Sequence, residues 1–249
     1  MSYDDFQSLQ ELGWDSSLAQ QLVRDGDDAL LPFRVLEVHR DKLRVAGENT
    51  NKLIELPVLA ERTDDEGAPT VGDWLLLDRD ALHFGRLLER QSLFKRRAAG
   101  TSGKTQLIAA NIDTDFIVSS CNQDFNEARL ARYLVLAREA KVFPVDVLTK
   151  ADLSDSPESY AKRARRLLPS LLVETVNALD SDSVRKLAPF CCTGQTVVLL
   201  GSSGVGKSTL VNSLTQSTAT ATQSVREEDD KGRHTTTGRA FYRLKDGGW

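Results

Sequence analysis

A glycine-rich segment at residues 201–208, GSSGVGKS, has the residue types and spacing that bind phosphate groups. It follows the P-loop pattern of a glycine, four residues and then Gly-Lys-Ser. Glycines allow the backbone to turn tightly, so that successive amide hydrogens point at phosphate oxygens, assisted by the positive end of the following helix. Lys207 would bridge the β- and γ-phosphates, and the Ser208 hydroxyl would ligate Mg²⁺. The predicted phosphate-binding residues are Gly201, Ser202, Ser203, Gly204, Val205, Gly206, Lys207, Ser208 and Thr209.

The residues on either side of this segment predict the elements that a P-loop requires. Residues 196–200 form a short, β-branched, apolar run that is typical of a buried parallel strand. Residues 208–214 place Leu210, Val211 and Leu214 on one side of an amphipathic helix. Strand, glycine loop and helix therefore occur in the required order, which disfavours the alternative of a turn without a ligand.

A second motif, Thr-Lys-Ala-Asp at residues 149–152, predicts which base accompanies the phosphates. The Asp152 carboxylate, at the end of an apolar strand, could accept hydrogen bonds from guanine N1–H and the 2-amino group, which adenine does not offer. Adenine would leave that carboxylate unpaired, at a cost of about 1–3 kcal/mol. The aliphatic part of Lys150 could lie across the base.

Two further features qualify this base site. Thr149 stands where the guanine motif usually has asparagine, so we expect weaker positioning of the base without loss of specificity. A predicted strand at 171–175 leads to Asn177 and Ala178, which could contact the base through the backbone. The base-reading motif precedes the P-loop, which is the reverse of the usual order.

The chain resembles a circularly permuted GTPase of the ribosome small subunit-dependent GTPase A family. Besides the two motifs, the resemblance covers residues 12–14 (Leu-Gly-Trp), 71–74 (Val-Gly-Asp-Trp), 109–113 (Ala-Ala-Asn-Ile-Asp) and the basic, hydroxyl-rich run KGRHTTT at 231–237. It implies GTP hydrolysis to GDP and phosphate, coupled to late assembly of the small ribosomal subunit. It also implies a subsequent Asp-Thr-Pro-Gly motif and a zinc-binding domain, and the ligands for that structural Zn²⁺ do not occur in these residues.

The same resemblance gives residues 232–237 the role of the first switch. A threonine there, Thr236 in the first instance and Thr235 in the second, would complete the Mg²⁺ shell when a γ-phosphate is present. His234 would help to position the attacking water, although a loop histidine is equally typical of a solvated position. Lys207, Thr236 and His234 are thus the predicted catalytic residues, with Ser208 and Thr236 as metal ligands.

Composition places the chain among ordinary globular proteins. It has 249 residues, 40% of them hydrophobic and 27% charged, and a net charge of −4. Its polar, acidic start and the absence of an apolar run of about 18 residues predict a cytoplasmic protein without a signal peptide or a membrane span. The three cysteines, Cys121, Cys191 and Cys192, lack zinc-site spacing and are interpreted as reduced thiols.

Changes in pattern along the chain predict an α/β protein with two domains. An acidic helical segment (1–32) precedes five short strands within 33–97, which suit a small β-barrel that the resemblance makes an OB-fold. A basic, small-residue linker is expected at 98–112. Residues 113–249 alternate strands with helices, as in a doubly wound, mainly parallel sheet. We expect a monomer.

Ribosomal RNA is the expected macromolecular partner. The overall negative charge argues against indiscriminate binding to nucleic acid, but basic residues gather in the barrel and the linker. The candidates are Arg34, Arg40, Lys42, Arg44, Arg86, Arg90, Lys95, Arg96 and Arg97. Solvated strand positions remain an alternative reading of these residues. Two alternatives to a ribosome-dependent GTPase also stay open, a non-catalytic factor that binds GTP and rRNA, and an ATP-dependent P-loop enzyme.

Overall fold

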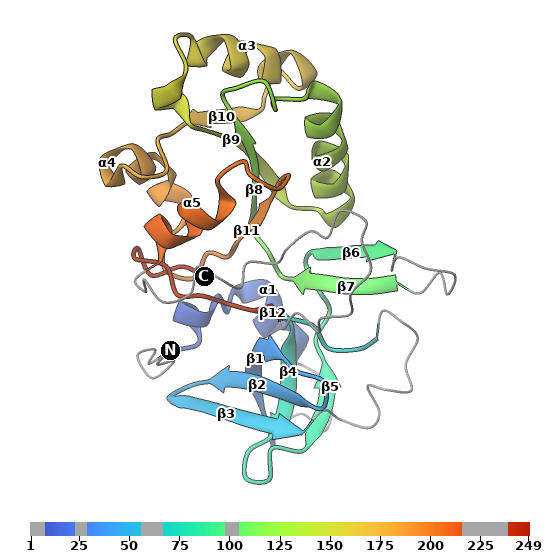
Figure 1. The fold of residues 1–249 in the computed structure, drawn as a ribbon. Coiled ribbons are helices and arrows are strands. Elements are labelled where there is room, and N and C mark those ends of the chain that lie inside the picture. Colours follow the sequence, from blue (N-terminus) through green and yellow to red (C-terminus); the bar gives the residue numbers. More distant parts are fainter. Residues whose placement is uncertain (1–7, 23–28, 56–66, 98–104, 216–238) are drawn as a thin grey trace. The chain divides into compact units, whose positions relative to one another are not determined.

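The computed structural model describes residues 8–22, 29–55, 67–97, 105–215 and 239–249 (Figure 1). The chain divides into two compact units. The first unit contains Met1–Ile112 and Gly238–Tyr242, and the second contains Asp113–Thr237 and Arg243–Trp249. No described helix is long and apolar enough to cross a membrane.

The first unit is built on an antiparallel sheet with the strand order β3-β2-β1-β4-β5. Apolar side chains alternate along these strands and meet in a core that includes Phe33, Val35, Leu43 and Leu75. This arrangement agrees with the predicted small β unit. The strands are β1 (Leu30–Val38), β2 (Lys42–Gly47), β3 (Thr50–Glu55), β4 (Trp74–Asp78) and β5 (Phe84–Leu87).

A sixth strand of this sheet comes from the far end of the chain. Strand β12 (Arg239–Ala240) pairs antiparallel with β1, and the Phe241 amide donates to the Leu36 carbonyl at 2.9 Å. The sequence analysis did not anticipate this strand, because a pairing of two residues leaves no periodic pattern to detect.

Part of the linker predicted at 98–112 belongs to a separate two-stranded sheet. Strand β6 (Leu93–Arg97) pairs antiparallel with β7 (Thr105–Ala110), and Phe94 and Ala109 are opposite each other and buried. Residues 105–110 are therefore a strand, since their apolar side chains have a partner strand to pack on. The short helical elements η1 (Gln10–Leu12), α1 (Ser16–Ala19) and η2 (Gln20–Leu22) precede the barrel.

The second unit contains a parallel sheet with the order β10-β9-β8-β11. Helices follow each strand, which confirms the predicted doubly wound architecture. The strands are β8 (Thr114–Ser120), β9 (Phe143–Thr149), β10 (Leu172–Thr175) and β11 (Val197–Leu200). The helical elements are α2 (Glu127–Ala140), η4 (Ala151–Leu153), α3 (Pro157–Leu167), α4 (Ser181–Val184), η5 (Arg185–Phe190) and α5 (Lys207–Leu214).

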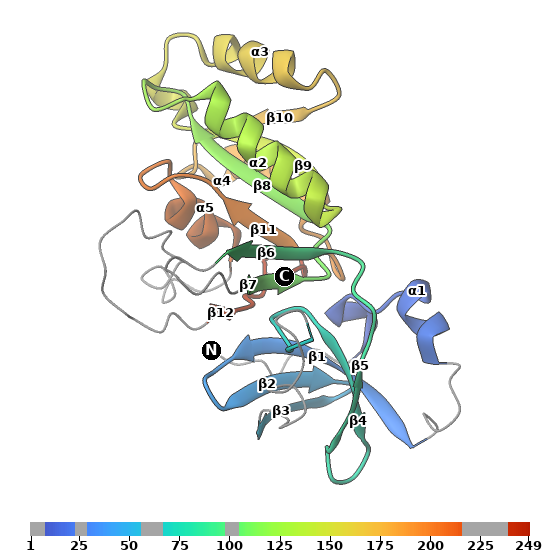
Figure 2. The same cartoon turned by 90° about the vertical axis from the view of Figure 1, so that its right-hand side faces the viewer.

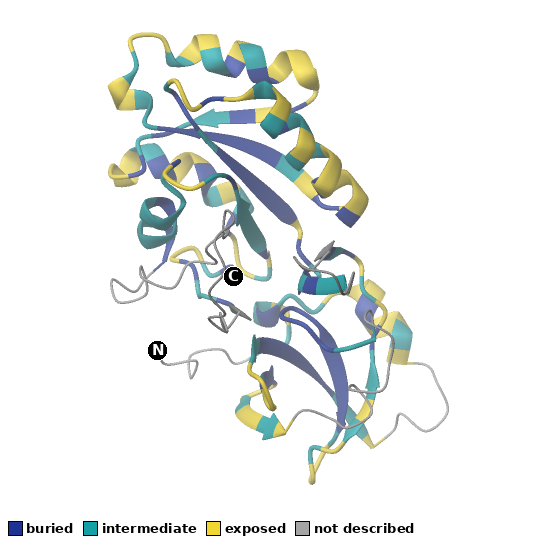
Figure 3. Ribbon diagram, turned by 45° about the vertical axis from the view of Figure 1, so that its right-hand side comes forward, coloured by how far each residue is buried: buried dark blue, intermediate teal, exposed yellow. Residues whose placement is uncertain are grey.

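Helices cover both faces of this sheet (Figure 2). On one face, Leu130 of α2 and Ala161 of α3 pack against Ile117 of β8. On the other face, Leu210 of α5 packs with Phe116 of β8. The central strands are consequently buried, whereas α2 and α3 expose their outer sides (Figure 3).

Two carboxylates lie in the middle of this sheet. Asp115 of β8 and Asp146 of β9 are both 0% exposed, and none of their carboxylate oxygens has a hydrogen-bond partner among the described residues. Burial raises the pKa of Asp115 well above its usual value and raises the pKa of Asp146 to about 7. The nearby Ser119 side chain offsets part of this rise in the Asp146 pKa. It does not form a hydrogen bond with the Asp146 carboxylate. Both groups therefore favour the protonated, neutral state.

Candidate nucleotide-binding site

The predicted phosphate loop connects β11 to α5 and has the backbone that its glycines allow. Gly201, Gly204 and Gly206 have φ values of 150°, 80° and 99°. A Cβ atom on Gly201 would lie 2.3 Å from the Val118 carbonyl oxygen, whereas one on Gly204 would meet no described residue within 4 Å. Gly201 thus allows the loop to approach β8 closely, and none of the described residues blocks a phosphate group beside Gly204.

The loop lysine is held by the loop itself. The Lys207 ammonium donates hydrogen bonds to the Gly201 carbonyl and, at 2.6 Å, to the Ser202 carbonyl. Lys207 is also the first residue of α5, and its N-cap, Gly206, provides no side chain to cap the helix. The positive charge and the start of the helix are therefore together on one side of the loop, an arrangement that favours an anion.

Thr149, at the end of β9, contacts the phosphate loop directly. Its side chain is 0% exposed, and its hydroxyl lies within hydrogen-bond distance of the Val205 carbonyl and, at 3.0 Å, of the Ser119 carbonyl. A Cβ atom on Gly206 would lie 3.3 Å from the Thr149 hydroxyl oxygen. The structure thus joins the predicted base-reading segment to the phosphate loop, although the two are more than fifty residues apart in the sequence.

The other predicted base-reading residues follow the same strand end. Lys150 has a left-handed backbone with φ of 56° and is half-buried, and Asp152 is exposed within η4. The Ala151 amide donates to the Val176 carbonyl, which brings the segment after β10 beside the motif. The structure therefore places Thr149, Lys150 and Asp152 at the carboxyl end of the parallel sheet.

Asn177 and Ala178 are tied to neighbouring elements. The Asn177 amide donates to the Ser183 hydroxyl at 2.9 Å, and its side-chain oxygen accepts from the Leu179 amide at 3.0 Å. The Ala178 carbonyl accepts a hydrogen bond of 2.5 Å from Ser213 of α5. The segment proposed to contact the base is thus connected to the helix that begins at the phosphate loop.

The predicted switch residues His234, Thr235 and Thr236 lie outside the described residues. Within the described part of the chain, no three His, Cys, Asp or Glu side chains cluster as metal ligands do. Ser208, on the first turn of α5, offers a hydroxyl oxygen, the donor type that Mg²⁺ accepts in P-loop sites. Among the residues present, Ser208 therefore provides an oxygen ligand that suits the predicted Mg²⁺.

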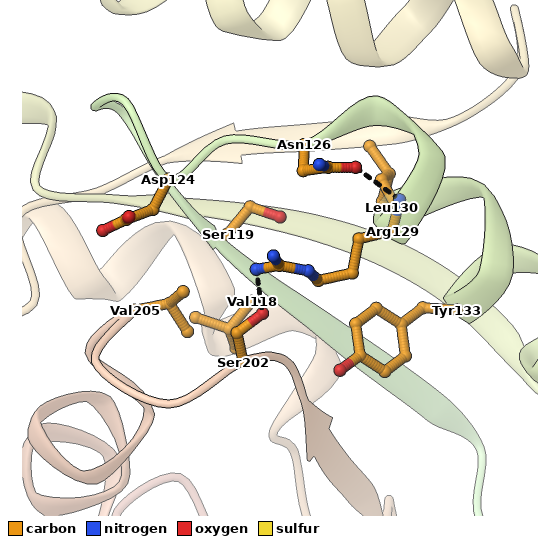
Figure 4. Close-up of a pocket in the computed structure, with 9 residues that line it drawn as sticks. All are labelled: Val118, Ser119, Asp124, Asn126, Arg129, Leu130, Tyr133, Ser202 and Val205. Carbon is orange, nitrogen blue, oxygen red and sulfur yellow. Dashed lines mark hydrogen bonds between the residues drawn. The ribbon is translucent and has the colours of Figure 1, made fainter. Parts of the chain in front are cut away.

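Sequence reasoning missed a pocket beside the phosphate loop. It is lined by nine residues, Val118, Ser119, Asp124, Asn126, Arg129, Leu130, Tyr133, Ser202 and Val205. Figure 4 shows the Arg129 side chain extending from α2 toward the loop, where its guanidinium donates to the Ser202 hydroxyl. No motif includes Arg129, so only the tertiary structure reveals this contact.

In the barrel, several of the predicted RNA-facing residues have other partners. Arg34 is 1% exposed and donates to the Leu12 and Asn111 carbonyls, so it does not belong to an RNA-binding surface. Arg90 forms a buried ion pair with Asp73 at 2.7 Å. Arg40, Lys42 and Lys95 are exposed. A charge pattern alone could not separate these groups, because arginine is exposed at most positions in proteins.

Comparison with known proteins decides the family. The sequence pattern of the family described as RsgA GTPase matches residues 87–249, which is more than half of the chain. The chain belongs to the RsgA GTPase family. Two relatives illustrate the extent of the match. The small ribosomal subunit biogenesis GTPase RsgA 2 of Vibrio parahaemolyticus is 47% identical over 96% of this chain and 65% of its own length. The RsgA of Mesorhizobium japonicum is 45% identical over 97% of this chain and 69% of its own length. The chain therefore spans about two thirds of the length of these RsgA relatives.

Solved structures show the same fold. YjeQ from Thermotoga maritima superimposes with a TM-score of 0.57 at 22% identity, over 74% of this chain and 64% of that one. YloQ, described as a circularly permuted GTPase, superimposes with a TM-score of 0.57 at 20% identity, over 78% of this chain and 67% of that one. The predicted circularly permuted RsgA fold is thereby confirmed.

Proposed function

We propose that this protein binds GTP and hydrolyses it to GDP and phosphate when it is bound to the small ribosomal subunit, in the late assembly of that subunit. The names of its relatives support this proposal, since both describe small ribosomal subunit biogenesis GTPases. The observation that carries it is the contact between Thr149 and the carbonyl of Val205, which unites the base-reading segment with the phosphate loop in one site. We place the protein in the cytoplasm, where ribosomes are assembled.

The chemistry would follow from the geometry of the loop. The backbone amides of 201–206 and the Lys207 ammonium would stabilise the charge that develops on the β- and γ-phosphates as water attacks. Mg²⁺, held by Ser208 and by a threonine of the 231–237 segment, would supply neutralising charge. His234 would orient the water. Because catalysis of phosphoryl transfer consists largely of positioning and electrostatic stabilisation, these groups suffice for a slow intrinsic reaction.

Specificity for guanine would come from Asp152, whose exposed position after β9 leaves its carboxylate accessible to a base. Replacement of Asp152 by Asn should lower the affinity for GTP about tenfold or more, because the amide cannot accept both guanine donors. If the protein is instead an ATP-dependent enzyme, the wild type will prefer ATP and Asp152→Asn will leave that preference unchanged.

Contact with rRNA would use exposed basic residues of the barrel. Arg40 and Lys42 lie at the turn between β1 and β2, and Lys52 is exposed on β3. Each phosphate contact removed should weaken binding to the small subunit and reduce its salt dependence. Arg34 does not contribute, because it is buried.

The decisive experiment measures phosphate release from GTP by this chain with and without purified small ribosomal subunits. We expect stimulation by the subunits and its loss in Lys207→Ala. Nucleotide binding without stimulated release would instead support a non-catalytic assembly factor that binds GTP and rRNA.

A further inference from the structure

The Arg129 side chain links helix α2 to the phosphate loop in a way that the helix alone does not explain. Arg129 is the third residue of α2, and its guanidinium donates to the Ser202 hydroxyl. The positive end of a helix dipole disfavours a cation in the first turn. An arginine at this position therefore costs α2 some stability, unless its charge is used elsewhere.

Arg129 forms no ion pair with a carboxylate within the described residues, although Asp124 also lines this pocket. The acidic residue of the same helical turn, Glu127, pairs instead with Arg163 of α3 at 2.7 Å. The α2 cap is also occupied, because Asn126 accepts a hydrogen bond from the Arg129 amide at 2.9 Å. The guanidinium is half-buried beside Val118 and Val205, where water screens its field less than at an open surface (Figure 4).

Ser202 is the point at which this charge meets the phosphate loop. Its hydroxyl accepts from Arg129, and its carbonyl accepts from the Lys207 ammonium at 2.6 Å. Arg129 thus holds the same residue whose backbone holds the phosphate-binding lysine. A loop that is fixed before the ligand arrives loses less entropy on binding, so this bridge should strengthen the binding of phosphates.

We propose that Arg129 is a positioning residue for the nucleotide phosphates, which acts through Ser202 to hold the phosphate loop and Lys207 in their binding geometry. This inference rests on the proposed GTP site, but it concerns the binding of phosphates and not the hydrolytic step. Among the described residues, Arg129 has no hydrogen bond or ion pair with the predicted base-reading residues, so its effect should be the same for any base.

The test compares the affinities of the nucleotide-free protein for GDP, GTP and ITP across five variants. They are Arg129→Ala, Arg129→Lys, Ser202→Ala, the double variant Arg129→Ala with Ser202→Ala, and Arg132→Ala. Arg132 is the matched control, because it is exposed on the next turn of α2 and has no partner among the described residues.

We expect Arg129→Ala and Ser202→Ala each to raise the Kd for GDP and GTP about tenfold, the lower range for a hydrogen bond to a charged group. The double variant should bind nucleotide no more weakly than either single variant, because both substitutions remove the same bridge. Arg129→Lys should recover part of the lost affinity, and Arg132→Ala should have the affinity of the wild type. The preference for GTP over ITP should not change in any variant. In the nucleotide-free protein, the amides of residues 202–206 should exchange hydrogen faster in Arg129→Ala.

The proposal would be overturned if folded Arg129→Ala bound nucleotide with wild-type affinity. It would also be overturned if the two affinity losses multiplied in the double variant, or if Arg132→Ala lost as much affinity as Arg129→Ala. A changed preference for GTP over ITP would show a general loosening of the site and would also overturn it. If these binding effects appear but small subunits do not stimulate hydrolysis, the proposed function fails and the role of Arg129 stands. A wild type that binds no nucleotide would refute both.

Discussion

Replacing Thr149 by Val tests how the base-reading segment is connected to the phosphate loop. Valine has nearly the shape of threonine but lacks the hydroxyl, so the substitution removes the hydrogen bond without opening a cavity. The hydroxyl is fully buried, and the carbonyls of Val205 and Ser119 are the two acceptors within reach of its single hydrogen. Val205 is itself only 3% exposed, so water cannot replace the lost donor there.

The magnitude follows from the cost of leaving a buried carbonyl without a partner. That cost is about 1–3 kcal/mol, which lowers the free energy of unfolding by the same amount. The Val205 carbonyl belongs to the phosphate loop, so part of the cost should also appear in nucleotide binding. At a factor of ten for every 1.4 kcal/mol, we expect the Kd for GDP and GTP to rise about tenfold.

The assay is equilibrium binding of GDP, GTP and ITP, together with thermal unfolding of the nucleotide-free protein. Thr149→Ser is the control, because it keeps the hydroxyl and should stay within about twofold of the wild type in Kd. If Thr149 acts through the loop, GTP and ITP should lose affinity equally, since inosine differs from guanosine only at the 2-amino group. Unchanged affinity in Thr149→Val would refute the connection, and a selective loss for GTP would show that Thr149 acts on the base.

Three further predictions use other parts of the structure. Gly201→Ala should abolish measurable GDP binding because its Cβ would collide with the Val118 carbonyl. Gly204→Ala meets no atom of the described residues and should cost only the roughly 1–2 kcal/mol of its left-handed backbone, so equal GDP binding by the two variants would contradict this. Burial raises the Asp146 pKa from 3.8 to about 7, so protonation favours the folded state, and this contribution to stability is complete below about pH 4 and lost as the pH rises to about 7. Asp146→Asn should therefore raise the melting temperature relative to the wild type at pH 8 by more than at pH 5, and a difference independent of pH in parallel melting curves would refute the assignment. Asp73→Ala should lower the free energy of unfolding by about 3–5 kcal/mol in urea titrations, because it leaves the nearly buried Arg90 without its carboxylate, and a loss below about 1 kcal/mol would show that the pair is dispensable.

The sequence predicts the elements of the second unit closely. Helix α2 (Glu127–Ala140) lies in the region expected to alternate strands with helices, and its cap at Asn126 and left-handed end at Lys141 are both local signals. The strand, glycine loop and helix of the phosphate site are likewise found where the motif places them. Local chemistry determines these features, so a single sequence is enough to predict them.

Features that depend on distant partners could not be predicted in this way. The burial of Arg34 depends on carbonyls at Leu12 and Asn111 and on the ring of Phe241, whose centroid lies 4.9 Å from the guanidinium. The role of Thr149 in holding the loop and the bridge from Arg129 also arise only when the strands come together. The predicted switch residues Thr236 and His234 remain predictions.

The pairing of β12 with β1 has a consequence for synthesis of the chain on the ribosome. Residues up to Ile112 emerge first, but the first unit also needs Gly238–Tyr242, including the Phe241 ring over Arg34. At about 5–20 residues per second, the ribosome must make the whole intervening segment before that strand can dock, a delay on the order of ten seconds. The Leu36–Val38 edge of β1 is available to other strands throughout that interval. The β1 edge of the newly made barrel can therefore pair with a wrong strand until β12 arrives. Variants that slow translation of the segment between Ile112 and Gly238 should consequently increase aggregation.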